Sequence, residues 1–459
     1  MKKDTIAAIS TAVSQSGIGI IRISGGEAFA VADRVYHAKG KEKRLSDQPS
    51  HTIQYGFIQD GKEVVDEVLV LLMRGPRSFT AEDTVEIHCH GGVYAMKRVL
   101  ETVLKNGARP AEPGEFTKRA FLNGRIDLSQ AEAVMDVIQA KNEYALQSSI
   151  SQLKGTLQTA IKELRSQIIY QIAFIESALD DPEHISLEGY PKQLQGEIKK
   201  WMEQIQKLID SSDNGRLMKE GVKTVIVGKP NAGKSSLLNS LLGEERAIVT
   251  DIAGTTRDVL TETIQLNGIT LNVTDTAGIR QTEDYVEQIG VKKAKETMET
   301  ADLIIYVVDS STRIDENDEK IIEALAGRKA VVLQNKTDLP TVTSEEELKK
   351  RIPDHQIIPI SAKDGSGIDQ LEQYVKELFY QGEISFNDQV FITNVRQKYS
   401  LIHALESLKQ VENSISMQMP EDFFSIDLMN AYEELGEITG ETVGEDLVNE
   451  IFGKFCMGK

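Results

Sequence analysis

The sequence predicts a multidomain fold in which an N-terminal α+β domain precedes an all-α helical domain, and an α/β domain is inserted into the helical one. Three observations predict this order. Short β-rich runs alternate with turns over residues 1–118. No proline occurs between Pro113 and Pro182, and apolar residues recur there at helical spacing, which returns after residue 379. Between the helical parts, a strand-like run, a glycine-bearing loop and a helix-like run follow one another.

The composition is typical of a soluble globular protein, and 459 residues leave room for about three domains. Lys2, Lys3 and Asp4 lead into a short mixed segment, so we expect no signal peptide. No apolar stretch approaches the ~20 residues that span a bilayer. The two cysteines, Cys89 and Cys456, predict no disulfide framework. We therefore expect a cytoplasmic protein with no membrane partner.

The net charge of −19 argues against strong non-specific binding to nucleic acid, which depends on basic surface. The charge is uneven along the chain. Residues 1–118 hold 16 basic and 15 acidic residues, a balance of +1, whereas residues 381–459 hold 5 basic and 14 acidic residues, a balance of −9. If a polyanion binds, we expect the N-terminal part or a partner protein to hold it.

The N-terminal domain, residues 1–118, is predicted to be α+β with a mixed sheet. Strand-like runs occur at 18–23, 67–73 and 84–88, and a helix-like stretch follows at 92–105.

The helical domain is predicted as two segments, 119–220 and 380–459, whose long helices form a bundle. A helix is expected over 193–219. Helical spacing is carried by Val134, Val137, Ile138, Ile168, Ile172, Ile175, Leu401, Leu405, Leu408, Leu447, Val448, Ile451 and Phe452. We interpret residues 221–379 as an α/β domain inserted into the helical domain, because the first and last residues of such a domain can lie close together.

A phosphate-binding loop is predicted at residues 228–235, which read Gly-Lys-Pro-Asn-Ala-Gly-Lys-Ser. The buried run 224–227 precedes the loop, and a helix-like run, 236–242, follows it. Strand, loop and helix together direct backbone N–H groups and a helix N-terminus at one anion. Lys234 can then reach the β- and γ-phosphates, and the Ser235 hydroxyl is placed for Mg²⁺.

Three downstream motifs at predicted strand ends select the nucleotide. Asp275-Thr-Ala-Gly278 follows a strand-like run, so its carboxylate can serve the metal and the Gly278 N–H can meet the γ-phosphate. Asn335-Lys-Thr-Asp338 offers two carboxylate oxygens to the N1–H and amine of guanine. Ser361-Ala-Lys363 suits backbone contact to guanine O6. The four motifs in this order predict an α/β P-loop GTPase domain.

The position after the Asp-x-x-Gly motif holds Ile279, where small regulatory GTPases have a glutamine that orients the attacking water. Isoleucine cannot hydrogen-bond to water, so either hydrolysis is very slow or another group acts. Residues 246–258 show no helical period and are predicted to form a switch loop whose threonines close on Mg²⁺.

Further motifs lie outside the nucleotide loops. They are Gly19-Ile-Ile-Arg-Ile-Ser-Gly25, Val85-Glu-Ile-His-Cys-His-Gly-Gly92, Pro113-Gly-Glu-Phe-Thr-Lys-Arg-Ala-Phe-Leu-Asn-Gly-Arg125, Asp127-Leu-Ser-Gln-Ala-Glu132, Gly254-Thr-Thr-Arg-Asp258 and Phe455-Cys-Met-Gly-Lys459. On these residues the chain resembles, over its full length, the tRNA modification GTPases of the MnmE (TrmE) type.

The resemblance implies a homodimer formed through the N-terminal domains, which would be folate-binding-like. It implies an FAD-containing partner, MnmG (GidA), in a heterotetramer. Together they would add a carboxymethylaminomethyl-type group to carbon 5 of the wobble uridine in certain tRNAs. A folate, 5-formyl- or 5,10-methylene-tetrahydrofolate, would supply the one-carbon unit.

By the same resemblance, Arg22, Glu86, Arg125 and the terminal Lys459 line the folate pocket. Arg125 departs from the family, in which lysine is familiar at this position, and a flat guanidinium is not an ammonium. Cys456, close to Lys459, is either a reactive thiol or a packed one. His88, Cys89 and His90 do not predict a metal site, because alternate strand residues face opposite sides.

The resemblance also assigns a potassium ion that stands where an arginine finger would. Its ligands would be Asn231, Thr250, Ile252 and Thr255, while Thr256 would join Ser235 on Mg²⁺. Glu287 would orient the water, so Glu287 and Lys234 are the expected catalytic residues. The full nucleotide-binding set is Asn231, Ala232, Gly233, Lys234, Ser235, Ser236, Thr250, Asp251, Ile252, Ala253, Gly254, Thr255, Thr256, Asp275, Thr276, Ala277, Gly278, Asn335, Lys336, Asp338, Ser361, Ala362 and Lys363.

Two alternatives stay open at this point. The first is a regulatory or ribosome-assembly GTPase without a role in tRNA modification, against which the terminal Cys-x-Gly-Lys and the N-terminal motifs argue. The second is a folate-dependent one-carbon enzyme with an idle GTPase domain, against which the intact nucleotide motifs argue.

Overall fold

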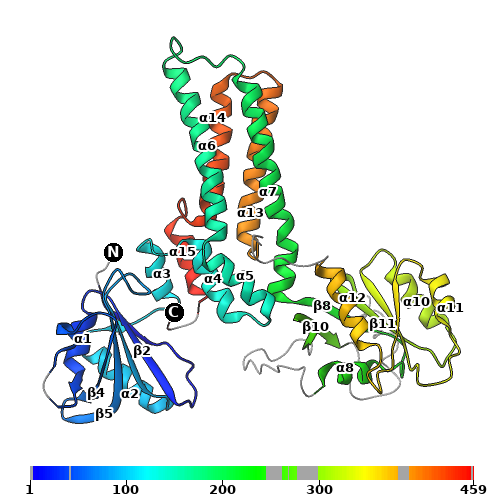
Figure 1. Ribbon diagram of the computed structural model, residues 1–459, viewed down its shortest axis with the longest axis horizontal. Coiled ribbons are helices and arrows are strands. Elements are labelled where there is room, and N and C mark those ends of the chain that lie inside the picture. Colours follow the sequence, from blue (N-terminus) through cyan, green and yellow to red (C-terminus); the bar gives the residue numbers. More distant parts are fainter. Residues whose placement is uncertain are drawn as a thin grey trace. The chain divides into compact units, whose positions relative to one another are not determined.

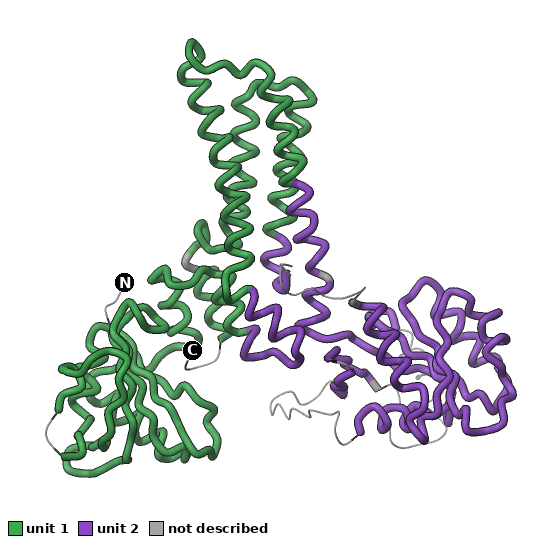
Figure 2. The backbone as a smooth tube through the Cα atoms, viewed as in Figure 1, with its two compact units in different colours: residues 1–135, 152–201, 400–459 green, residues 136–151, 202–399 purple. Residues whose placement is uncertain are grey.

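The computed structural model describes residues 4–40, 43–243, 261–266, 268–275, 298–380, 392–455 and 458. The chain folds into two compact units. Unit 1 comprises residues 1–135, 152–201 and 400–459, and unit 2 comprises residues 136–151 and 202–399 (Figure 2). The helical segments before and after the α/β domain therefore contribute to one unit.

Unit 1 contains a seven-stranded sheet in the order β3-β4-β5-β6-β2-β1-β7 (Figure 1). Its strands are β1 (Ile6–Ile9), β2 (Ile18–Ser24), β3 (Tyr36–Ala38), β4 (Thr52–Asp60), β5 (Glu63–Met73), β6 (Thr84–His90) and β7 (Arg109–Pro110). Neighbouring strands are antiparallel except β1 and β7, which are parallel. The predicted mixed sheet is confirmed, and the strand runs predicted from the sequence lie in β2, β5 and β6.

One face of this sheet carries the core of the N-terminal part. The helices α1 (Ala28–Val35) and α2 (Val93–Lys105) pack there on buried strand residues such as Ile21, Val70 and Ile87. Because strand side chains alternate between faces, β6 turns Cys89 into this core, whereas His90 is exposed on the opposite face. Cys89 and His90 therefore lie on opposite faces of the sheet.

The helices of unit 1 come from both sides of the α/β domain. Besides α1 and α2, the described helices that lie wholly or partly in unit 1 are η1 (Leu45–Asp47), α3 (Glu115–Leu122), α4 (Leu128–Gln139), α5 (Glu143–Leu153), α6 (Thr156–Asp180), α7 (Tyr190–Glu220), α13 (Val395–Ser416), α14 (Glu421–Thr439) and α15 (Glu445–Gly453). The helix α6 lies along α14 (Figure 1), and the Arg165 Nε donates to the Tyr432 carbonyl at 3.1 Å. Ile168, Ile172 and Ile175 are buried, as their spacing predicts. Ile138, by contrast, is 43% exposed.

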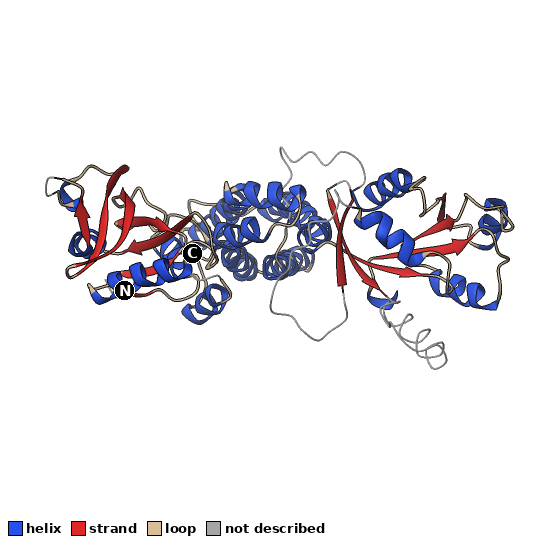
Figure 3. Cartoon of the chain, turned by 90° about the horizontal axis from the view of Figure 1, so that it is seen from below, coloured by secondary structure: helices blue, strands red, loops and turns tan. Residues whose placement is uncertain are grey.

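Unit 2 contains a six-stranded sheet in the order β13-β12-β11-β8-β10-β9. Its strands are drawn as red arrows in Figure 3. The strands are β8 (Val222–Val227), β9 (Thr261–Leu266), β10 (Ile269–Asp275), β11 (Leu303–Asp309), β12 (Ala330–Asn335) and β13 (Gln356–Pro359). All neighbours are parallel except β9 and β10. The strands β11 and β12 are buried along their whole length because helices cover both faces of the sheet.

The helices of unit 2 divide between the two faces of its sheet. The helices α8 (Lys234–Leu242) and α12 (Ile368–Tyr380) pack on one face. The helices α10 (Glu316–Leu325) and α11 (Glu345–Arg351) pack on the other. In such sheets the carboxyl ends of the parallel strands form the ligand-binding edge. Among the described helices, none is long and apolar enough to cross a bilayer.

Candidate functional site

The loop between β8 and α8 has a conformation that its glycines permit. Gly228 has φ +153°, and a Cβ there would lie 2.4 Å from the Val307 carbonyl oxygen. Gly233 has φ +101°, and a Cβ there would lie 2.1 Å from the Asn335 Nδ2. Asn231 also has a positive φ, 60°, a region that asparagine tolerates better than most residues. The loop therefore passes close to the neighbouring strands, where only glycine fits.

The first turn of α8 provides the predicted anion site. The helix begins at Lys234, and its opening N–H groups have no partner within the helix, so they can meet a phosphate. The Lys234 Nζ donates to the carbonyl oxygens of Gly228 and Lys229, at 2.7 Å each. Ser235 and Ser236 follow in the same turn. The cation, the helix end and the hydroxyl predicted for Mg²⁺ thus lie together.

Asn335, at the end of β12, joins the phosphate loop to the predicted guanine loops. Its side chain is buried, its Nδ2 donates to the Ala232 carbonyl at 2.8 Å, and its Oδ1 accepts from the Ala362 N–H at 3.0 Å. One amide therefore cross-links three chain segments that are far apart in sequence. The structure brings together the motifs that begin at Gly228, Asn335 and Ser361.

Asp338 lies beside these residues with its carboxylate partly exposed, as recognition of a base requires. The Ser361 hydroxyl donates to Asp338 Oδ1 at 3.3 Å, and the Lys363 Nζ lies 4.0 Å from Oδ2. Lys363 is itself largely exposed, and such an ion pair contributes little energy. The carboxylate thus keeps acceptor capacity for a ligand.

Asp309, which sequence reasoning missed, holds the lysine of the guanine motif. Its Oδ2 lies 2.6 Å from the Lys336 Nζ, and Lys336 has a left-handed φ of 64°. Burial alone would raise the pKa of Asp309, but the hydrogen bonds from Lys336 and Ser311 outweigh it and hold the pKa below its ordinary value. The sequence does offer one sign that Asp309 belongs to the site. It is the last residue of a buried parallel strand, as Asp275 and Asn335 are.

A second group of predicted residues gathers in unit 1, on β2, β6 and the segment after α3. The Arg22 Nε donates to Glu86 Oε1 at 2.8 Å, across a directly paired position of β2 and β6. The guanidinium carbons of Arg22 and Arg125 lie 5.5 Å and 5.1 Å from the centre of the Phe79 ring. The Arg125 Nη1 also donates to the Phe79 carbonyl at 2.9 Å. Phe79, which no sequence motif indicated, is the common contact of the two arginines.

The C-terminal end of the chain lies near this group. The Ser10 hydroxyl donates to the Gly458 carbonyl at 3.0 Å. Ser10 directly follows β1, whose Ala8 pairs with Arg22 of β2. Gly458 has φ +91°, and a Cβ there would lie 2.2 Å from the Ile9 carbonyl oxygen. Gly458 is thus placed against the end of β1, the strand that pairs with the Arg22 strand β2.

Comparison with known proteins supplies the family. A family model described as the MnmE helical domain matches residues 128–456, and one described as the GTP-binding protein TrmE N-terminus matches residues 5–125. A curated tRNA modification GTPase MnmE of Lachnoclostridium phytofermentans is 58% identical over 459 residues, covering 100% of both chains. That of Acetivibrio thermocellus is 48% identical over 460 residues, again covering 100% of both. The chain belongs to the MnmE family of tRNA modification GTPases.

A crystal structure of Aquifex aeolicus Era bound to GDP and AlF4⁻ is also similar. The two are 29% identical, and the match covers 40% of this chain and 66% of that chain with a TM-score of 0.28. The family assignment rests on the relatives and the family models rather than on this partial likeness.

Several residues predicted for this MnmE-family chain lie outside the described part of the structure. They are Thr250, Asp251, Ile252, Ala253, Gly254, Thr255, Thr256, Thr276, Ala277, Gly278, Ile279, Glu287, Cys456 and Lys459. Asp275 ends β10 at the ligand-binding edge, but its side chain is also outside the description. Their roles stay predictions. Within the described residues, no cluster of three or more histidine, cysteine or acidic side chains is arranged to hold a metal.

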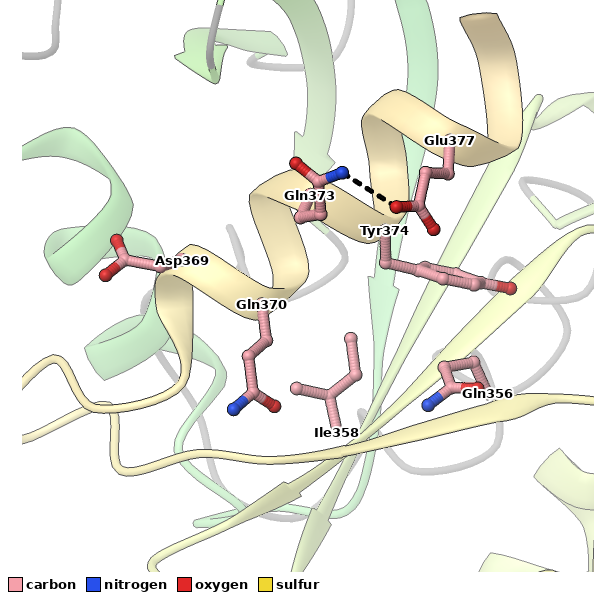
Figure 4. Close-up of a pocket in the computed structure, with 7 residues that line it drawn as sticks. All are labelled: Gln356, Ile358, Asp369, Gln370, Gln373, Tyr374 and Glu377. Atoms are coloured by element: carbon pink, nitrogen blue, oxygen red, sulfur yellow. Dashed lines mark hydrogen bonds between the residues drawn. The ribbon is translucent and has the colours of Figure 1, made fainter. Parts of the chain in front are cut away.

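A groove of about 490 Å³ lies elsewhere in unit 2, between the edge strand β13 and α12 (Figure 4). Tyr374 and Ile358 form its apolar wall, and the Gln373 Nε2 donates to Glu377 Oε1 at 2.7 Å on its rim. No residue predicted for the MnmE-family sites lines this groove. The groove is therefore separate from the residues that are predicted to bind the nucleotide.

Proposed function

We propose that this chain hydrolyses GTP with Mg²⁺ and K⁺ in the modification of tRNA. With the FAD-containing partner MnmG (GidA), it adds a carboxymethylaminomethyl-type group to carbon 5 of the wobble uridine of certain tRNAs. The observation that carries the proposal is the Asn335 cross-link, which holds the phosphate loop and both guanine loops in one site. Because Asn335 holds the phosphate loop and the guanine loops in place beforehand, binding of a guanine nucleotide requires little loss of conformational entropy in these loops.

The described residues fit the cations that the proposal requires. The Ser235 hydroxyl, in the first turn of α8, would hold Mg²⁺, and the side-chain oxygen of Asn231 would be a ligand of K⁺. Both are oxygen donors of the kind that hard cations prefer. Lys234 binds and orients the phosphates. GTP hydrolysis would drive opening and closing of paired GTPase domains rather than perform chemistry on the base.

The residues gathered around Phe79 fit a folate. Two guanidinium groups against one aromatic ring form a cationic and aromatic wall, which suits a flat ring system that carries carboxylates. Arg22 and Arg125 would orient the ligand, and Glu86 would fix Arg22. When bound, 5-formyl- or 5,10-methylene-tetrahydrofolate would supply the one-carbon unit. The resembled family has lysine at the position of Arg125, but Arg125 contacts Phe79 and can therefore also orient the ligand.

Exposed apolar side chains on β4 and β5 of the unit 1 sheet support a homodimer formed through the N-terminal domains. Ile53, Tyr55 and Leu69 are 61%, 44% and 46% exposed. Tyr55 and Leu69 are paired across β4 and β5. Neighbouring apolar side chains exposed on a sheet are typical of a protein–protein contact surface. A second copy of the same face would bury them.

Mass spectrometry of wobble-uridine nucleosides in tRNA tests the proposal. A strain that lacks the gene should lose the carbon-5-modified nucleoside, and the wild-type chain should restore it. An unchanged nucleoside profile in the deletion strain would favour the regulatory or ribosome-assembly GTPase instead. Restoration by a chain that cannot bind guanine nucleotides would favour the folate enzyme with an idle GTPase domain.

A further inference from the structure

Lys229, the second residue of the phosphate loop, connects the loop to a buried carboxylate. Its Nζ lies 2.6 Å from Asp318 Oδ2 and 3.0 Å from Asp315 Oδ2, and it also donates to the Arg313 carbonyl at 3.3 Å. Asp318 is only 1% exposed. The phosphate loop is therefore tied to the N-terminus of α10 by an ion pair that is largely withdrawn from water.

Asp318 is held rigidly from the other side. Its Oδ1 accepts from the Tyr306 hydroxyl at 2.8 Å, and its Oδ2 accepts from the Asp315 N–H at 3.0 Å in the capping box of α10. Tyr306 is fully buried in β11 and pairs with Val227, the last residue before the loop. The acceptor for Lys229 is thus fixed to the strand that adjoins the start of the loop.

The backbone carbonyl of Lys229 accepts two hydrogen bonds from within the loop. It accepts from the Ala232 N–H at 3.2 Å and from the Lys234 Nζ at 2.7 Å. Holding the Lys229 side chain therefore also holds the carbonyl that positions the phosphate-binding lysine. Burial alone would lower the pKa of Lys229, but the hydrogen bonds to Asp318 and Asp315 outweigh it and raise the pKa. Lys229 is accordingly charged at neutral pH.

We propose that Lys229 is a positioning residue for the β-phosphate of the nucleotide, acting through its ion pair with Asp318. The pair fixes the shape of the loop before the nucleotide arrives, so that the loop N–H groups need no reordering on binding. The inference rests on the proposed use of guanine nucleotides by this site.

The test is the affinity of the full chain for three nucleotides that differ in phosphate number. Lys229→Met keeps the length of the side chain and removes its charge. Binding of GTP and GDP should weaken on the order of tenfold to a hundredfold, since the lost hydrogen bonds join charged groups and are stronger than neutral ones. GMP, which lacks the β-phosphate, should keep its affinity. Lys229→Arg should restore GDP binding, because its guanidinium can reach both carboxylates.

Lys320→Met is the matched control, because Lys320 is an exposed lysine of the same α10 helix. It should bind all three nucleotides as the wild type does. Equal GDP affinity in Lys229→Met and the control would overturn the inference. An equal loss for GMP and GDP would also overturn it, because the effect would then be on the stability of the domain. Failure of the wild-type chain to bind GDP would instead refute the proposed function.

Discussion

Replacement of Asn335 by alanine should weaken guanine-nucleotide binding strongly, although its amide need not touch the nucleotide. The substitution removes the hydrogen bonds to the Ala232 carbonyl and from the Ala362 N–H. Ala232 is 1% exposed and Ala362 is 8% exposed, so water does not readily replace the lost partner. Each stranded buried group costs about 1–3 kcal/mol.

Two such groups give about 2 kcal/mol at the low end of that range, which corresponds to a roughly thirtyfold weaker affinity. The loss applies to GDP and GTP alike, because the cross-link organises the site before either binds. Titration with a fluorescent GDP analogue measures it directly. Asn317→Ala, which removes an exposed amide from α10 in the same unit, serves as the control. A GDP affinity for Asn335→Ala within twofold of that control would refute the reasoning.

Three further predictions concern the base, the N-terminal ligand and the cation. Asp338→Asn should shift preference from GTP to XTP, because the pair of acceptors for the N1–H and amine of guanine is lost; an unchanged ratio of GTP to XTP turnover would contradict the assignment. Arg22→Ala should abolish binding of formyl-tetrahydrofolate in calorimetric titration and leave GTP hydrolysis near its wild-type rate, since the two sites lie in different units; undiminished folate affinity would place the site elsewhere. Hydrolysis should require potassium chloride and fail in sodium chloride at matched ionic strength, with an effect of ~10³–10⁵ if the ion replaces an arginine finger. Glu287→Ala should slow turnover without weakening GTP binding, and equal rates in the two salts would refute this mechanism.

Most of the fold could be predicted because its elements have strong periodic signals. The buried runs at 224–227 and 330–334 are recognisable since helices cover both sides of a parallel sheet, and they lie in β8 and β12. The spacing of Ile168, Ile172 and Ile175 likewise predicted a buried helix face.

Ile138 shows the limit of this reasoning. Its apolar side chain fits the period near the end of α4 but is exposed, because burial depends on a neighbour that periodicity does not specify.

The nucleotide site could be predicted for a different physical reason. The carboxyl ends of parallel strands meet at one edge of a sheet, so motifs that follow such strands converge whatever their separation in sequence. Asn335 and Ala362 confirm this convergence with a direct hydrogen bond. The partners Asp309 and Phe79 could not be predicted with equal force, because each acts through tertiary contacts and belongs to no motif.

The strand β11 shows why motif residues alone do not define this site. It contains no nucleotide-binding motif, yet two of its residues hold lysines of the nucleotide loops, Asp309 directly and Tyr306 through Asp318. Tyr306 fixes Asp318, which pairs with Lys229 of the phosphate loop, and Asp309 pairs with Lys336 of the guanine loop. The strand β11 is buried along its whole length, so it cannot shift without disturbing the close-packed core around it. Changes in its packing should therefore alter phosphate binding and guanine binding together.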